Sequence, residues 1–236
     1  MASSNRLIVA LDTADLKKAE KIVRALTPLV KMFKVGKELF TVAGPDAVKM
    51  VRRHKAGVFL DLKFHDIPNT VGAACAAATR LGVSMLNVHA SGGKPMLFQA
   101  VQAVHKTSAE LKIKPPILLG VTVLTSLTDQ DLKEVGFAQK TAQQVERLAK
   151  LSKNCGLDGV VASGQEIGLI RKATQTPFVI VTPGVRPLWS APGDQKRIIT
   201  PEKAIKDGAD FIVVGRPITE NPDPKVAAKK ILNEIS

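Results

Sequence analysis

The sequence predicts a single (β/α)8 barrel, and three observations lead to that fold class. The chain has 236 residues, and α/β barrels of about 200–250 residues form one domain. Eight apolar, β-branched runs recur along the chain, separated by segments with helical periodicity. Polar side chains gather where these runs end, as they do in a barrel whose strand ends build one site. We therefore expect residues 1–236 to form one barrel domain.

The expected strands are short runs, and the expected helices have apolar residues three and four positions apart. The strands in chain order are Leu7–Asp12, Met32–Gly36, Val58–Phe64, Met85–Ala90, Ile117–Leu124, Gly159–Ala162, Phe178–Thr182 and Phe211–Gly215. Helical segments include Asp15–Leu26, Pro95–Leu111, Thr141–Asn154, Pro201–Asp207 and Pro224–Ile235. A doubly wound open sheet is the alternative, but it would have fewer strands and a glycine-rich turn after the first. Residues 11–15 contain no glycine.

Composition excludes several classes of protein. Two cysteines, Cys75 and Cys155, provide neither a disulfide framework nor zinc-ligand spacing. No apolar run approaches the roughly 20 residues that a membrane span needs, so we expect a soluble, cytoplasmic protein. The formal net charge is +13, but aromatic residues are only 4% and tyrosine is absent. Because stacking aromatics are scarce and the lysines lie mostly at helical spacing, we expect solvated helix faces and no nucleic-acid partner.

The third expected strand carries an unusual pair of charges. Alternate side chains of Val58–Phe64 point to opposite faces, so one face is wholly apolar and should pack against helices. Asp61 and Lys63 share the other face, where burying both charges is costly unless they are paired. Asp66 follows in a loop, since Pro68 ends the strand ladder. Both a structural ion pair and a catalytic Asp-Lys-Asp array are consistent with this pattern.

Polar residues also end the neighbouring strands. They are Asp12, Lys34 with Gly36, Asn87 with His89, and Thr125 with Ser126. Because the C-terminal strand ends of a barrel meet at one face, we expect these side chains to lie beside Asp61 and Lys63. Five adjacent strands that contribute charged or hydroxyl groups favour a catalytic array over a structural ion pair.

The seventh and eighth strands lead into loops that contain glycine and arginine, Thr182–Pro187 and Val214–Pro217. Loops after these two strands form the common phosphate site of (β/α)8 barrels. Glycine allows close backbone approach, and Arg186 and Arg216 can bind phosphate oxygens in bidentate fashion. Two surface arginines beside ordinary turns are the alternative. The segment 188–199, rich in turn residues, is expected to act as a lid.

These motifs resemble those of the orotidine 5′-phosphate decarboxylase family, bacterial type, and the decapeptide Asp61–Thr70 is the most specific match. Further matching segments are Phe33–Gly36, Val88–Gly93, Thr182–Arg186, Gly193–Gln195 and Val214–Ile218. The resemblance extends over Leu7–Thr219. It implies a cofactor-free (β/α)8 homodimer that converts orotidine 5′-phosphate to UMP and carbon dioxide in the last step of pyrimidine nucleotide synthesis.

The resemblance also implies a role for each matching residue. Lys63 would protonate C6 of the pyrimidine, with Asp61 beside it and Asp66 of the partner subunit completing a shared site. The implied substrate contacts are Asp12, Lys34 and Thr70 to the ribose and the charged array, Thr125 and Ser126 to the pyrimidine edge, Arg186, Gln195, Gly215 and Arg216 to the phosphate, and Pro183. One local departure is Leu188-Trp189 in the expected lid, where small polar residues would be unsurprising.

Two alternative functions stay open. Magnesium-dependent sugar-phosphate decarboxylases and hexulose-phosphate synthases of the same superfamily also use Asp-x-Lys-x-x-Asp. They place a metal-binding carboxylate where this chain has Lys34, and an ammonium there would expel a cation. A metal site built from Asp61, His65 and His89 is less favoured, because lone histidines at strand ends are more often hydrogen-bonded structural groups, and no metal is expected. A non-catalytic phosphate-binding barrel would have no need for Lys63 between two carboxylates.

Overall fold

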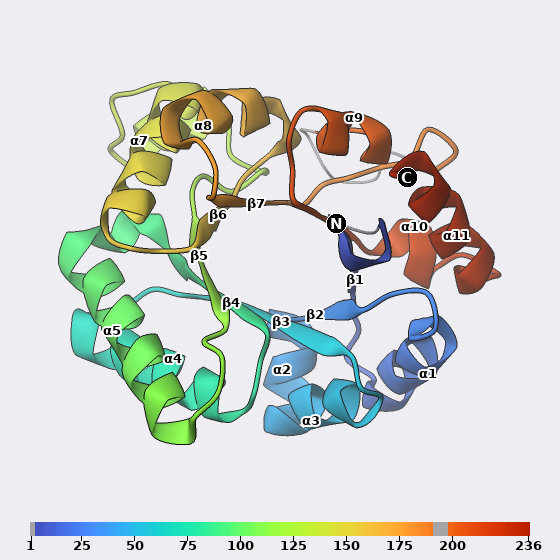
Figure 1. Ribbon diagram of the computed structural model, residues 1–236. Helices are drawn as coiled ribbons and strands as arrows, with labels where there is room; N and C mark the ends of the chain where they lie inside the picture. Colours follow the sequence, from blue (N-terminus) through green and yellow to red (C-terminus); the bar gives the residue numbers. More distant parts are fainter. Residues whose placement is uncertain (1–2, 191–197) are drawn as a thin grey trace.

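The computed structural model describes residues 3–190 and 198–236, and it contains a closed barrel of parallel strands in the order β1 to β8. The strands are β1 (Leu7–Ala10), β2 (Met32–Gly36), β3 (Gly57–Phe64), β4 (Met85–His89), β5 (Ile117–Val121), β6 (Gly159–Val161), β7 (Val179–Thr182) and β8 (Phe211–Val214). The barrel closes between β8 and β1, where Ile212 aligns with Leu7. Figure 1 shows the strands around the centre and the helices as an outer ring. The predicted fold class is confirmed.

The helices lie outside the barrel and connect successive strands. They are α1 (Leu16–Leu26), α2 (Lys37–Ala43), α3 (Pro45–Arg53), α4 (Pro68–Arg80), α5 (Gly93–Leu111), α6 (Asp129–Glu134), α7 (Thr141–Asn154), α8 (Ile167–Thr174), α9 (Pro201–Lys206), α10 (Arg216–Thr219) and α11 (Pro224–Glu234). The predicted helical segments correspond to α1, α5, α7, α9 and α11, with ends shifted by at most two residues. Across the described ranges, no helix is long and apolar enough to cross a membrane.

Several strands are shorter at their C-terminal ends than predicted. Strand β1 stops at Ala10 instead of Asp12, and β5 stops at Val121 instead of Leu124. One further backbone hydrogen bond to the neighbouring strand follows each of them, from Leu11 N to Lys34 O and from Thr122 N to Val161 O. The polar residues expected at these strand ends therefore lie in the loops that form the rim of the barrel.

Side chains of the strands alternate between two apolar layers. The layer inside the barrel consists of Ile8, Ala10, Phe59, Met85, Leu119, Val121, Val161, Val181, Phe211 and Val213. Neighbours such as Val58 and Leu60 belong to the larger layer between strands and helices and are almost fully buried. Burying one such side chain contributes about 1.5–3 kcal/mol relative to leaving it exposed. The prediction that the apolar face of β3 packs against helices is confirmed.

The connection from β3 to α4 is a short turn over residues 65–67. Pro68 is the first residue of α4, where its missing N–H removes no helix hydrogen bond. Asp66 lies in this turn, as predicted, and its Oδ1 accepts the backbone N–H of Ile67 at 2.6 Å. Thr70 lies in the first turn of α4 and faces solvent.

Candidate active site

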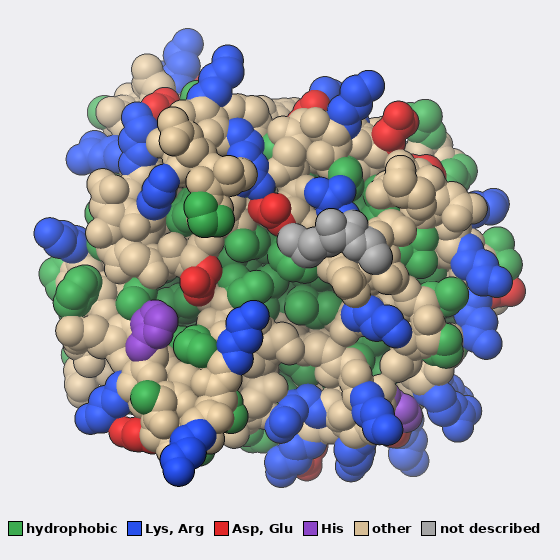
Figure 2. All heavy atoms as spheres, viewed as in Figure 1, with side chains coloured by type: hydrophobic (Ala, Val, Ile, Leu, Met, Phe, Trp, Pro, Cys, Tyr) green, Lys and Arg blue, Asp and Glu red, His purple; other side chains and the backbone are tan. Residues whose placement is uncertain are grey.

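A cavity of about 500 Å³ opens at the C-terminal ends of the strands. Its apolar floor is the top of the inner core, including Phe59 and Val213. Its polar lining consists of Asp12, Lys34, Glu38, Asp61, Lys63, Thr125, Arg186, Arg216 and Glu220. Such a volume, with few polar groups over an apolar floor, is typical of a small-molecule site. Figure 2 shows the opposite face of the molecule, where the strands begin, with Lys and Arg side chains mostly around its edge and hydrophobic ones nearer its centre.

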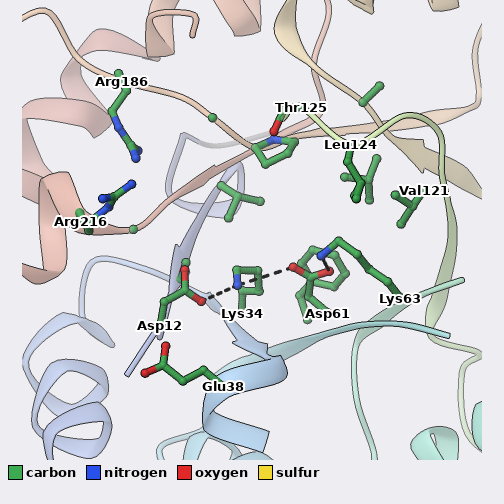
Figure 3. Close-up of a pocket in the computed structure, with 18 of the residues that line it drawn as sticks. Asp12, Lys34, Glu38, Asp61, Lys63, Val121, Leu124, Thr125, Arg186 and Arg216 are labelled. Carbon is green, nitrogen blue, oxygen red and sulfur yellow. Dashed lines mark hydrogen bonds and ion pairs between the residues drawn. The ribbon is translucent and has the colours of Figure 1, made fainter. Parts of the chain in front are cut away.

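Four charged side chains of alternating sign cross the pocket (Figure 3). Lys63 Nζ donates a hydrogen bond to Asp61 Oδ1 at 2.6 Å. Lys34 Nζ lies 2.7 Å from Asp12 Oδ1 and 3.6 Å from Asp61 Oδ2. They come from β3, from β2 and from the loop after β1, so the barrel brings together residues that the strand ends predicted. Asp61 lies between two ammonium groups.

The position of Asp61 determines its ionisation. Burial by itself raises the pKa of this carboxyl. The charges of Lys34 and Lys63 oppose burial, and hydrogen bonds from Lys63 and Asn87 add to their effect, so the pKa lies below its ordinary value. Asp61 is therefore an anion at neutral pH, and it holds the adjacent ammonium groups in place.

Glycine at position 36 leaves room for the ion pair beside it. A Cβ added at Gly36 would lie 2.8 Å from Lys34 Nζ and 3.1 Å from Asp12 Oδ1. Gly36 also precedes α2, whose first turn brings Glu38 to the pocket wall. Neither Glu38 nor Glu220, which follows α10, was predicted from the sequence. Glu38 lies on a helix of seven residues and Glu220 directly follows a helix of four, and such short helices leave little periodic signal.

The loops after β7 and β8 bring two guanidinium groups to the opposite side of the pocket. Figure 3 shows Arg186 and Arg216 pointing toward each other. Arg186 is only 9% exposed, and burial, with a smaller contribution from Arg216, lowers the pKa of Arg186. Pro183 and Gly184 also line the pocket, and Gly184 has a φ of 73°, in the left-handed region. Two adjacent cations over a glycine-containing loop are suited to bind a polyvalent anion.

Several of the predicted site residues lie elsewhere. Thr125 and Gly215 line the pocket. Ser126 is exposed and is not part of the pocket wall. Asp66 and Thr70 are also exposed and outside the wall. The prediction for Gln195, and most of that for a lid over 188–199, falls outside the described residues.

Two histidines lie next to the charged array. The ring centroids of His65 and His89 are 5.3 Å apart. Burial, followed by the charges of His65 and Lys63, lowers the pKa of His89 to about 4, so this imidazole is neutral at pH 7. Within residues 3–190 and 198–236, no group of three or more His, Cys, Asp or Glu side chains is placed to hold a metal ion.

The buried amide of Asn87 connects Asp61 and Lys63 of β3. Its Nδ2 donates to Asp61 Oδ1 at 2.7 Å, and its Oδ1 accepts the backbone N–H of Lys63 at 2.8 Å. Asn87 was expected at a polar strand end, with no role predicted for it. An amide on a strand otherwise rich in apolar residues was the only available signal.

Fold and pocket together define a (β/α)8-barrel protein with a charged array at its mouth and two arginines in the loops after its last two strands. The comparisons with known proteins identify the family within this class. The chain belongs to the orotidine 5′-phosphate decarboxylase / HUMPS family, whose model matches residues 5–231. The resemblance read from the motifs is thereby confirmed.

Close relatives and solved structures agree with this assignment. Orotidine 5′-phosphate decarboxylase of Moorella thermoacetica is 54% identical over 236 residues, covering 100% of this chain and 94% of that protein. The enzyme of Syntrophotalea carbinolica is 54% identical over 231 residues, covering 98% and 95%. The crystal structure of orotidine 5′-phosphate decarboxylase from Lactobacillus acidophilus has a TM-score of 0.86 at 38% identity, covering 98% of this chain and 99% of that one.

Proposed function

We propose that this protein is a carboxy-lyase that converts orotidine 5′-phosphate to UMP and carbon dioxide, the last step of pyrimidine nucleotide synthesis. Family membership and the full-length similarity to relatives of that name support the reaction. The structural observation that carries the proposal is the Asp12-Lys34-Asp61-Lys63 array, which shares a pocket with two arginines. A cytoplasmic location and a single domain over residues 1–236 belong to the same proposal.

The reaction requires stabilisation of negative charge on carbon. Loss of carbon dioxide leaves an electron pair at C6 of the pyrimidine, with no ring position to delocalise it efficiently. A fixed positive group at that place lowers the barrier, because it is already oriented when the charge develops. Lys63, held by Asp61 at 2.6 Å, is such a group. Its ammonium stabilises the carbanion and then transfers a proton to C6, which yields UMP.

The two arginines act at the other end of the substrate. Arg186 and Arg216 would bind the phosphate oxygens, with Gly215 at the same rim and Gln195 as a further contact. Binding energy from this non-reacting group serves catalysis when it orients the pyrimidine over Lys63. A neutral nucleoside would lose this contribution.

Between these ends, the ribose and the base need hydrogen-bonding partners. Asp12 and Lys34, whose carboxylate and ammonium are 2.7 Å apart at the rim, are suited to bind ribose hydroxyls. Thr125 lies in the wall on the β5 side and can meet the pyrimidine edge. Ser126 is the next residue, and a role in substrate binding would require its exposed side chain to turn toward the ligand. Pro183 adds an apolar contact.

We extend the proposal to a homodimer with shared sites. All six residues from His65 to Thr70 are exposed, and Ile67 among them is 66% exposed although it is a large apolar side chain. A second copy that covered this turn would bury Ile67 and receive Asp66 and Thr70 at its own pocket. In that arrangement, Asp66 of the partner subunit would complete the charged array beside Lys63.

The alternative within this family is a metal-dependent sugar-phosphate enzyme. An assay with purified protein distinguishes the two, because orotidine 5′-phosphate loses its characteristic ultraviolet absorbance on decarboxylation. We expect full activity in excess EDTA, since Lys34 occupies the place where those enzymes carry a metal-binding carboxylate. Absence of absorbance loss, or activity that vanishes in EDTA and returns with magnesium, would overturn the proposed function.

A further inference from the structure

We propose that Asn87 of β4 is a positioning residue for the decarboxylation: one side-chain amide fixes both the carboxylate of Asp61 and the backbone of Lys63. This inference rests on the proposed function, because it assigns Asn87 a task only through Lys63. Asn87 itself does not line the pocket and is 0% exposed. It therefore acts through the two residues that it contacts.

The orientation of the amide follows from its partners. The backbone N–H of Lys63 can only donate, so it requires the Asn87 oxygen, at 2.8 Å. The ionised carboxylate of Asp61 can only accept, so it requires the Asn87 nitrogen, at 2.7 Å. Turning the amide round would break both hydrogen bonds. The Asn87 nitrogen would then face the Lys63 N–H, donor against donor, and its oxygen would face the Asp61 carboxylate, acceptor against acceptor. Of the neutral side chains, only an amide of this length offers a donor and an acceptor in the required places.

The backbone that Asn87 holds is an unfavourable one. Lys63 has a φ of 54°, in the left-handed region that residues with a Cβ rarely adopt. At the same place the register between β3 and β4 shifts, between Leu60 and Phe64. The Asn87 side chain accepts the Lys63 N–H where the regular strand pairing is interrupted. Without it, the chain would be free to relax and carry the Lys63 side chain away from C6.

The same amide also restrains the carboxylate. Asp61 Oδ1 accepts hydrogen bonds from both Lys63 Nζ, at 2.6 Å, and Asn87 Nδ2, at 2.7 Å. Its other oxygen lies 3.6 Å from Lys34 Nζ on β2. Asp61 is thereby held from three strands. Because a buried carboxylate rotates toward whatever donors remain, loss of the amide would change the direction in which Asp61 pulls the Lys63 ammonium.

The first test replaces the amide with an apolar group of similar size. In Asn87→Leu we expect kcat to fall about 10- to 100-fold, the effect of a misplacement of about 1 Å. The dissociation constant of UMP should stay within about threefold, because Asn87 does not touch the ligand pocket. Ser152→Ala on α7 is the matched control, since it removes another fully buried polar side chain that neither lines the pocket nor contacts Asp61 or Lys63. It should leave both constants unchanged.

The second test keeps the shape and changes one atom. In Asn87→Asp the new carboxylate still accepts the Lys63 N–H, but when ionised it repels Asp61. As the pH falls, the two carboxylates take up one shared proton, which restores a donor and a single negative charge. We expect the ratio of variant to wild-type kcat to rise roughly fivefold or more from about pH 8 to about pH 6. The corresponding ratio for Asn87→Leu should stay flat.

Other titratable groups near Asp61 do not produce this pattern. Lys34 faces it from β2 and Lys63 from its own strand, while His65 and His89 lie on the neighbouring side of the array. All of them are present in Asn87→Leu as well, so a flat ratio for that variant beside a pH-dependent one for Asn87→Asp assigns the effect to the new carboxylate. Under the proposed assembly, the same holds for Asp66 of the partner subunit.

The outcomes separate this inference from the proposed function. Lys63→Ala, assayed in parallel, must abolish activity; if it does not, the role of Lys63 is wrong, whereas the proposed function itself fails only if the wild type does not decarboxylate orotidine 5′-phosphate. If Lys63→Ala is inactive but both Asn87 variants keep kcat within threefold of wild type, or if the Asn87→Asp ratio is flat with pH, the positioning role is wrong. If either Asn87 variant folds poorly, its kinetic test is replaced by a comparison of ¹⁵N NMR spectra of the wild type and of Asp61→Asn. The Asn87 side-chain amide signal must shift between the two, and an unchanged signal overturns the inference.

Discussion

Lys63 and Asp61 are two positions apart on β3, and the ammonium of one donates to the carboxylate of the other at 2.6 Å inside the pocket. A second ammonium, that of Lys34, lies 3.6 Å from the same carboxylate. Ion pairs removed from water contribute little net stability, because desolvation offsets their attraction. An array of this kind at a pocket wall is therefore better explained by the charge that it presents to a ligand than by a contribution to folding.

Replacing the proposed proton donor should separate chemistry from binding. We expect Lys63→Ala to lower kcat by at least about 10³-fold, because the ammonium acts on charge that develops only in the transition state. UMP, which carries no such charge at C6, should still bind with a measurable dissociation constant. Single-turnover kinetics and calorimetric titration would measure the two effects. Equal losses of kcat and of UMP affinity would contradict the assignment.

The arginines should discriminate between a nucleotide and a nucleoside. We expect Arg216→Ala to weaken UMP binding about 10- to 100-fold, since hydrogen bonds to charged groups contribute about 1.5–3 kcal/mol. Binding of uridine, which has no phosphate, should change by less than about twofold. Calorimetry with both ligands measures this difference.

A matched variant controls for the overall positive field of the protein. Arg24→Ala removes one charge from the exposed face of α1, far from the pocket, and should leave both affinities unchanged. If Arg216→Ala weakened UMP and uridine equally, the residue would not bind the phosphate.

His89 should make stability depend on pH. Its pKa is lowered to about 4 in the folded protein and is about 6.5 in an unfolded chain. Between these values the unfolded state binds more protons, so the free energy of unfolding falls as the pH decreases from about 6.5 toward 4. We expect a loss of about 1–3 kcal/mol from pH 7.5 to pH 4.5 that is absent in His89→Gln. Urea unfolding at the two pH values measures it.

The control for this prediction is a histidine on the surface. His105 lies exposed on α5, and His105→Gln should keep the pH dependence of the wild type. If His89→Gln lost the same stability as wild type between the two pH values, the environment of His89 would be different from the one described.

Sequence reasoning identified those site residues whose direction follows from the alternation of side chains along a strand. Asp61 and Lys63 could be assigned to the barrel interior because alternation places them with Phe59, opposite the apolar residues of β3. The left-handed backbone of Lys63 could not be predicted, since it arises from the register shift between β3 and β4. The shift depends on how neighbouring strands stagger when the barrel closes, which no local pattern encodes.

Contacts between side chains of separate elements could not be predicted from the sequence either. Asn87 was visible as a polar strand end, but its contact with Asp61 joins positions 26 residues apart. Glu38 was overlooked because a seven-residue helix carries too few turns to show which face points at the pocket. The place of Arg186 and Arg216 in the pocket could be predicted, since loops after β7 and β8 form an anion site in many barrels and each arginine lies within two residues of a glycine in the chain.

The last prediction concerns the shared sites of the proposed homodimer. Asp66 is exposed and outside its own pocket wall, whereas Lys63 lines it. If each site uses Lys63 of one chain and Asp66 of the partner subunit, Lys63→Ala and Asp66→Ala should both be inactive as pure proteins. In a mixed dimer, one site receives both defects and the other receives neither.

Mixing equal amounts of the two inactive variants should therefore restore activity. Random exchange makes about half of the dimers mixed, each with one intact site of two, so activity should reach roughly a quarter of the wild-type value. The exchange itself is followed by native mass spectrometry with one variant isotopically labelled. A mixture of Lys63→Ala with the double variant Lys63→Ala/Asp66→Ala is the control and should stay inactive, because no intact site can form. If mixed dimers form and the activity does not recover, Asp66 acts within its own chain and the shared site is wrong.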